Sequence, residues 1–210
     1  MISVLIGIIG LTFMQAGAVS APLIDMRGPE PILRLPPAMT EALRQFDSDF
    51  TPRRMRDYPR WIWSPADCEP QPECRQTRYK PTSRQALFAV IGDFNGDRIL
   101  DVVVDGDDRV QARRLVILSE GSRFRVTELT HSDHISKEVE ARRKVGITAG
   151  SRDDGLDYGL SLVRRGTVQS HFEPSPLVLA TDAFEEEFWE KSAVVHYYRD
   201  GRWQDYWTSD

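Results

Sequence analysis

The most constraining feature of this chain is a short acidic loop held between two apolar segments. The loop covers residues 92–101, and its oxygen-bearing side chains recur at a regular spacing: Asp93, Asn95, Asp97 and Asp101. The flanking runs, residues 86–91 and 102–104, are short, apolar and rich in β-branched side chains, a composition typical of strands. The pattern therefore predicts two neighbouring strands joined by a turn that gathers several oxygens.

This spacing is that of a loop that wraps one calcium ion. Calcium takes six to eight oxygen ligands at about 2.3–2.6 Å. Carboxylates held within about 5 Å of one another repel by roughly 3 kcal/mol per pair at an effective dielectric constant near 20, so an empty loop is under strain. We therefore expect calcium as the cofactor, with these ligands: Asp93, Asn95, Asp97 and Asp101 by their side chains, and Ile99 by its carbonyl. The alternative is an acidic turn without a metal.

Two loop types begin in this way. An EF-hand requires glycine at position six, a bidentate glutamate at position twelve, and a helix on each side. Those positions hold Arg98 and Val104 here, and both flanks have the composition of strands. The sequence is therefore incompatible with an EF-hand.

Residues 92–104, with the sequence GDFNGDRILDVVV, resemble a single copy of the FG-GAP/VCBS repeat. The resemblance implies a calcium-loop hairpin of the kind found in β-propeller blades and in exported bacterial proteins. The chain departs from that family at Arg98, where the family usually has glycine. A non-glycine residue at positive φ costs about 1 kcal/mol, which bears on the tightness of calcium binding.

The length of the chain limits the architecture. A propeller needs several blades of about 40–50 residues each, and 210 residues with one good loop do not provide them. We expect a β-rich α+β fold, mainly an antiparallel sheet or sandwich with one or two short helices, and not a full propeller. The predicted strands are residues 86–91, 101–104, 114–118, 124–129, 145–149 and 158–163.

Other elements follow from local patterns. Apolar residues at helical spacing predict a helix over residues 38–50, and residues 183–191 have the composition of a helix start. The Asp200-Gly201 pair predicts a hairpin turn between residues 193–199 and 202–208. Trp61 and Trp63 fit either internal packing or a carbohydrate-binding platform.

The N-terminus has the layout of a secretory signal. An apolar run over residues 4–14 ends in small residues that would allow cleavage between Ala18 and Ala21. The run is shorter than the roughly 20 residues that span a membrane, so we expect no stable span after its removal. The predicted organisation begins with a signal peptide (residues 1–21). Residues 22–85 hold a proline-rich lead-in, a helix and a disulfide loop, and they form one domain with the β-rich core (86–210). The predicted location is periplasmic or extracellular.

Cys68 and Cys74 are the two cysteines of the chain. An even number of cysteines in an exported protein favours a disulfide. A bridge between them would close a loop so short that it stabilises by roughly 2 kcal/mol.

The formal net charge is −5, which argues against a nucleic-acid partner, because such binding depends on Lys and Arg neutralising phosphates. A protein or glycan partner is left open.

Catalytic motifs are scarce. The chain has no Gly-x-Ser-x-Gly, Ser-x-x-Lys or His-Glu-x-x-His. We therefore expect a non-catalytic, binding or envelope-associated protein. The alternative is a secreted or periplasmic hydrolase that uses His131 and His134 or the acidic cluster of Asp105, Asp107 and Asp108.

Overall fold

The computed structural model describes residues 20–63, 79–108, 110–132, 156, 158–189 and 191–209. Within this part the elements in chain order are β1 (Leu23–Asp25), β2 (Ile32–Arg34), α1 (Pro37–Phe46), β3 (Thr51–Pro52), the 3₁₀ turn η1 (Met55–Asp57), α2 (Arg60–Trp63), β4 (Gln85–Ala86), β5 (Ala89–Gly92), β6 (Asp101–Asp107), β7 (Ala112–Glu120), β8 (Arg123–Ser132), β9 (Tyr158–Val163), β10 (Gly166–Val168), β11 (Leu177–Leu179), β12 (Ala183–Phe188), β13 (Ser192–Arg199) and β14 (Arg202–Ser209).

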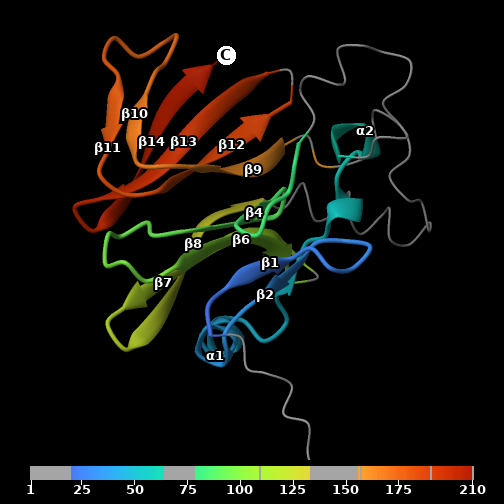
Figure 1. Ribbon diagram of the computed structural model, residues 1–210. Helices are drawn as coiled ribbons and strands as arrows, with labels where there is room; N and C mark the ends of the chain where they lie inside the picture. Colours follow the sequence, from blue (N-terminus) through green and yellow to red (C-terminus); the bar gives the residue numbers. More distant parts are fainter. Residues whose placement is uncertain are drawn as a thin grey trace, which may run out of the picture.

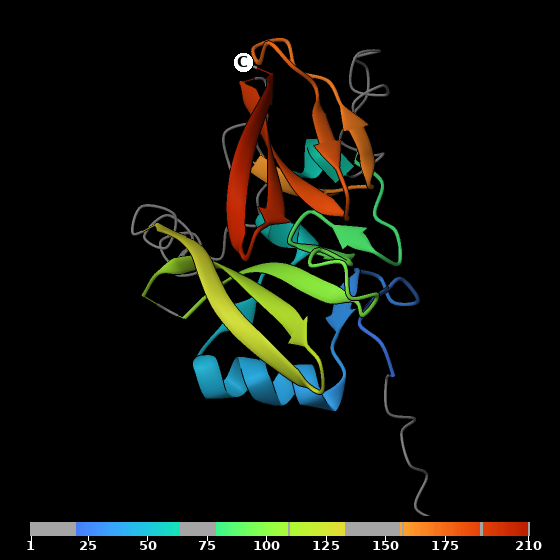
Figure 2. The same ribbon diagram turned by 90° about the vertical axis from the view of Figure 1, so that its left-hand side faces the viewer.

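Two antiparallel sheets and a helix form three layers (Figures 1 and 2). The middle layer is a sheet in the order β4-β5-β6-β7-β8, and β3 pairs with the far end of β6. The second sheet has the order β14-β13-β12-β9. Figure 2 shows this second sheet, in orange and red, above the middle sheet, and α1, in blue, below it.

Both faces of the middle sheet are covered, which explains its apolar sequence. Along β6, Val102 and Val104 belong to one buried cluster and Val103 to another. The same alternation occurs along β5 and β7, because successive side chains in a strand point to opposite faces. Strands buried on both faces have nearly continuous hydrophobic runs instead of polar alternation, and this is the composition of residues 102–104 and 115–118.

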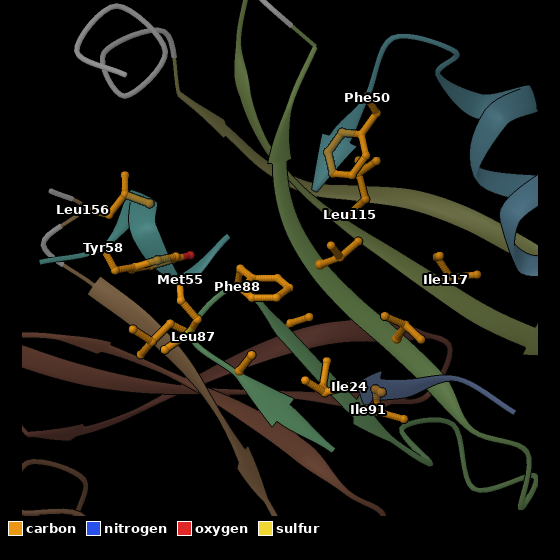
Figure 3. Close-up of a cluster of buried hydrophobic side chains, with 14 of the residues drawn as sticks. Ile24, Phe50, Met55, Tyr58, Leu87, Phe88, Ile91, Leu115, Ile117 and Leu156 are labelled. Carbon is orange, nitrogen blue, oxygen red and sulfur yellow. The ribbon is translucent and has the colours of Figure 1, made fainter. Parts of the chain in front are cut away.

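The larger cluster lies between the middle sheet and the N-terminal segments. Figure 3 shows Ile24, Phe50, Met55 and Tyr58 gathered against side chains of the middle sheet. Met39 and Leu43, on the inner face of α1, belong to the same cluster. The segment before residue 86 therefore shares a core with the strands that follow it.

The smaller cluster lies between the two sheets. Side chains of β5, β6 and β7 meet Leu160 of β9 and Phe184 of β12 there. Phe94, from the loop after β5, is fully buried in this cluster and makes edge contacts with Phe184 and Trp203, with ring centroids 6.3 and 5.7 Å apart. The acidic loop thus contributes a central side chain to the contact between the sheets.

The predicted fold class is confirmed: the described chain is β-rich, its sheets are antiparallel, and they form no propeller. The helix predicted over residues 38–50 is present as α1, although it ends at Phe46. The predicted terminal hairpin is also present, with Asp200 and Gly201 both at positive φ in its turn.

The helical start predicted at residues 183–191 is wrong. Residues 183–188 form β12, which pairs with β9 along its whole length and with β13 over residues 184–188. Three consecutive glutamates suit the first turn of a helix, but pairing with two neighbouring strands overrides that local preference. The strand prediction at residues 145–149 lies outside the described residues.

Trp63 packs against the larger cluster, and its indole N–H donates to the carbonyl of Tyr58 at 3.3 Å. Internal packing thus accounts for Trp63, one of the two tryptophans considered for a carbohydrate platform. Among the described helices, none combines the length and the apolar character that crossing a membrane requires.

Candidate functional site

The acidic loop connects β5 to β6 as the sequence predicts. The two strands pair antiparallel, with Gly92 opposite Asp101, so the first and last residues of the loop are held side by side. Gly92 is required at this point, because a Cβ would lie 2.8 Å from the ring of Phe94 and 3.0 Å from the side chain of Asp182. The base of the loop is therefore packed tightly between the two sheets.

Asp93 folds the loop back on itself. Its carboxylate accepts hydrogen bonds from the N–H of Gly96 at 2.8 Å and from the N–H of Arg98 at 3.1 Å. Both donors have positive φ, 84° for Gly96 and 70° for Arg98. The positive φ expected at Arg98 is thus present, in a conformation that L residues other than glycine adopt at a cost.

Asp97 and Asp101 meet at a side chain outside the loop. The hydroxyl of Ser119, on β7, lies 2.6 Å from Asp97 Oδ2 and 2.9 Å from Asp101 Oδ1. A hydroxyl carries one proton, so Ser119 donates to only one of these carboxylates at a time. The other carboxylate then faces a lone pair of the hydroxyl oxygen, unless a proton or a cation lies between them.

Asp101 is fully buried at the start of β6. Burial raises the pKa of its carboxyl group from 3.8 to about 6, although hydrogen bonds from the N–H groups of Ser119 and Phe94 oppose the rise. The buried carboxylate is therefore costly to ionise without a further positive partner.

Asn95 lies at the same place. Its side-chain nitrogen donates to the carbonyl of Ser119 at 2.7 Å, and its oxygen accepts from the N–H of Asp97 at 3.1 Å. Ile99 is 40 % exposed, and its N–H donates to Asp97 Oδ1 at 2.8 Å. The structure therefore gathers Asn95, Asp97 and Asp101 around Ser119.

The donor chemistry of this site fits a hard cation. Carboxylate and amide carbonyl oxygens are ligands that calcium prefers. Asp93 is turned toward the N–H groups of the loop, and among the described residues no group of three or more His, Cys, Asp or Glu side chains is arranged to hold a metal. Calcium at Asp93, Asn95, Asp97, Ile99 and Asp101 therefore stays a prediction.

The loop is also fastened to the second sheet. The N–H of Asp93 donates to Asp182 Oδ2 at 3.3 Å, and the N–H of Asp182 donates to the carbonyl of Asp93 at 3.1 Å. Asp182 precedes β12 and is held by Arg164 at 3.2 Å. The conformation of the loop is thus linked to the start of a strand in the opposite sheet.

A second polar cluster, buried between the sheets, has Arg114 of β7 at its centre. Its guanidinium group binds Asp105 at 2.8 Å and Glu186 of β12 at 2.6 and 2.7 Å. His196 of β13 follows, with Nε2 3.3 Å from Glu186 and Nδ1 2.7 Å from Asp205 of β14. We call Asp105, Arg114, Glu186, His196 and Asp205 the ionic chain.

Ser119 and most of the ionic chain were not predicted from the sequence. Ser119 ends an apolar run and has no motif around it. Arg114 and Glu186 each belong to a short run of like charges, and such runs are typical of solvent-exposed segments. Only the alternation of side chains along a strand could have predicted that one residue of each run is buried.

Of the residues proposed for a hydrolase, the structure describes the acidic cluster and the backbone of His131. Asp105 is paired with Arg114, while Asp108 accepts from two backbone N–H groups of its own turn and lies 3.3 Å from Arg113. The backbone of His131 belongs to β8, opposite Arg113. His134, Cys68, Cys74 and nearly all of the predicted signal peptide lie outside the described residues.

The resemblance of residues 92–104 to an FG-GAP/VCBS repeat stays a prediction. Comparisons of the chain with models of protein families, with curated proteins and with solved structures found no match in any of the three.

Proposed function

We propose that this protein is an exported, calcium-binding domain with a non-catalytic role, in which calcium fixes the β5–β6 loop against the second sheet. The observation that carries the proposal is the meeting of Asp97 and Asp101 at the hydroxyl of Ser119, with Asn95 beside them. A cation between these oxygens would satisfy two carboxylates that a single hydroxyl proton cannot.

The position of the loop gives a bound ion a structural effect. Phe94 lies between Asp93 and Asn95 and is buried between the two sheets, and the backbone of Asp93 is bonded to Asp182. Fixing the oxygens of the loop therefore also fixes a core aromatic side chain and the start of β12. Weak sites are filled at the millimolar calcium found outside cells, which agrees with the signal peptide predicted at residues 1–21.

The ion pairs favour a non-catalytic role over the hydrolase. In the described structure Asp105 and Asp108 are bound by arginines or by backbone N–H groups. Such carboxylates position strands and turns, and we propose binding to a protein or a glycan as the activity.

Calcium titration of the purified protein tests this proposal. For a dissociation constant of 0.1–1 mM, typical of extracellular modules, 10 mM calcium should stabilise the fold by about 1–3 kcal/mol. The melting temperature should then rise by several degrees relative to protein in chelator. Asp97→Asn should remove most of that rise, because it takes away one charged ligand.

Glu173→Gln is the matched control, because it removes one carboxylate from an exposed loop away from the site. It should keep the full response to calcium. Equal melting temperatures in calcium and in chelator, together with no calcium binding by calorimetry, would show that the protein does not bind calcium.

A further inference from the structure

The ionic chain connects the two sheets through Arg114 and Glu186, and a histidine extends it across the second sheet. Arg114 and Asp105 belong to the middle sheet, and the other three members belong to neighbouring strands of the second sheet. His196 is paired in register with Phe184 on one side and with Asp205 on the other. Its ring stacks on Phe184 at 4.7 Å between centroids, so its orientation is fixed by packing as well as by charge.

Each nitrogen of the His196 ring faces a carboxylate, Glu186 on one side and Asp205 on the other. Only the protonated imidazole has two N–H donors. When the ring is neutral, one nitrogen is an acceptor and faces a carboxylate that is also an acceptor. The observed arrangement is therefore that of the charged ring, and loss of its proton must break one of the two contacts.

The two carboxylates differ in how firmly they are held. Both oxygens of Glu186 are bound by Arg114, and its side chain is 12 % exposed. The side chain of Asp205 is 61 % exposed, and water can replace its contact with His196. The contact that breaks is therefore the one with Asp205.

We propose that His196 is a proton-operated clasp that fastens β14, the outer strand of the second sheet, to the buried ionic chain. The protonated ring holds Asp205 and closes the chain across β12, β13 and β14. Loss of the proton releases Asp205 and loosens the outer strand, while Arg114 continues to hold Glu186 and the two sheets together.

The charges around the ring support this direction. Asp205 on β14 and Glu186 on β12 face the ring, Arg114 on β7 lies behind Glu186, and Asp105 on β6 and the Tyr158 ring on β9 adjoin Arg114. Burial alone would lower the pKa of His196, but hydrogen bonds with Asp205 and Glu186 outweigh burial and raise it above 6.5. The clasp does not depend on calcium, because none of the predicted ligands belongs to it.

Nuclear magnetic resonance of the whole protein tests the clasp. The ring signals of His196, assigned by their loss in His196→Gln, should titrate above pH 6.5. Amide-exchange protection factors across β14 should fall several-fold as the pH rises through that value, both in calcium and in chelator. In His196→Gln the protection should be low and independent of pH over the same range.

A second test variant and a control variant complete the experiment. Asp205→Asn, at an exposed side chain, should lower the titration midpoint of His196 and reduce the protection of β14 at low pH. His171→Gln, at an exposed histidine, should leave both unchanged. Titration of His196 at or below pH 6.5 would overturn the proposal. So would a pH-dependent fall of β14 protection in His196→Gln or Asp205→Asn that equals the fall in the unmodified protein.

Discussion

At the scale of single residues, the structure shows how a few side chains carry conformations and charges that their neighbours must support. Arg98 keeps a positive φ because Asp93 accepts a hydrogen bond from its N–H. Arg114 keeps a buried charge because Asp105 and Glu186 surround it. In both cases a carboxylate compensates for a feature that would otherwise destabilise the fold.

Replacing Arg98 with glycine should stabilise the protein modestly. The change removes about 1–2 kcal/mol of left-handed strain and adds about 0.5–1 kcal/mol of backbone entropy cost. The expected gain in the free energy of unfolding, measured by urea denaturation, is therefore between zero and about 1.5 kcal/mol, with tighter calcium binding. Asp200→Gly, at the other described non-glycine residue with positive φ, should give a similar gain without affecting calcium binding. Weaker calcium binding in Arg98→Gly would contradict this prediction.

Removing the charge of Arg114 should be strongly destabilising. Arg114→Met leaves Asp105 and Glu186 without their partner in a buried site, a situation that typically costs about 3–5 kcal/mol. Chemical denaturation should show this loss in the free energy of unfolding. Arg125→Met removes a half-exposed partner of Glu120 and should cost about 1 kcal/mol or less; equal losses for the two variants would refute the structural role of the ionic chain.

At the scale of elements, the local pattern predicted the long strands better than the short ones. The strands that became β6, β7, β8 and β9 were expected because runs of β-branched and apolar residues suit a buried sheet. The short strands β1, β2, β10 and β11, of three residues each, were missed. Three residues are too few to show a periodic pattern of apolar side chains. Only hydrogen bonding with a partner strand makes such a segment a strand.

Gly106 tests one close contact between elements. A Cβ at this position would lie 2.3 Å from Phe50 Cζ and 2.5 Å from the carbonyl oxygen of Thr51, so it would displace β3 from β6. Gly106→Ala should lower the free energy of unfolding by about 1–3 kcal/mol. Gly28→Ala meets nothing closer than 3.6 Å and should be nearly neutral in the same denaturation experiment; a neutral Gly106→Ala would show that β3 is not held in this position.

At the scale of the whole molecule, buried titratable groups set the pH at which the fold is most stable. Asp101 and His196 both have raised pKa values in the folded state. The stabilising contribution of Asp101 is complete below pH 3.8 and is lost as the pH rises to about 6. The contribution of His196 is complete below pH 6.5 and is lost as the pH rises through its raised pKa. Burial would raise the pKa of Glu186, but its hydrogen bonds with His196 and Arg114 lower it to about 2. Its contribution is present above 4.5 and is lost toward pH 2.

Protein in chelator should therefore be most stable near pH 4. It should lose stability between about pH 4 and 6 as Asp101 ionises, and lose more above about pH 6.5 as His196 loses its proton. The shift at Asp101, from 3.8 to about 6, corresponds to about 3 kcal/mol by neutral pH. Urea denaturation from pH 3 to 9 should show this fall, and Asp101→Asn should flatten it. Calcium should also reduce the fall, because a cation compensates the ionised carboxylate. Stability that rises between about pH 4 and 6 would contradict the assignment.

The sequence by itself determined the β-rich class, the acidic loop between two strands, the positive φ at Arg98 and the terminal hairpin. These features depend on residues close together in the chain, whose side-chain and backbone preferences act locally. Only the tertiary structure decided that Ser119 meets Asp97 and Asp101, that β12 is a strand, and that Arg114 is buried against Glu186. The physical reason is that each of these outcomes depends on partners far away in the chain: the cost of burying a charge, or the gain from pairing a strand, is set by groups that no local pattern identifies.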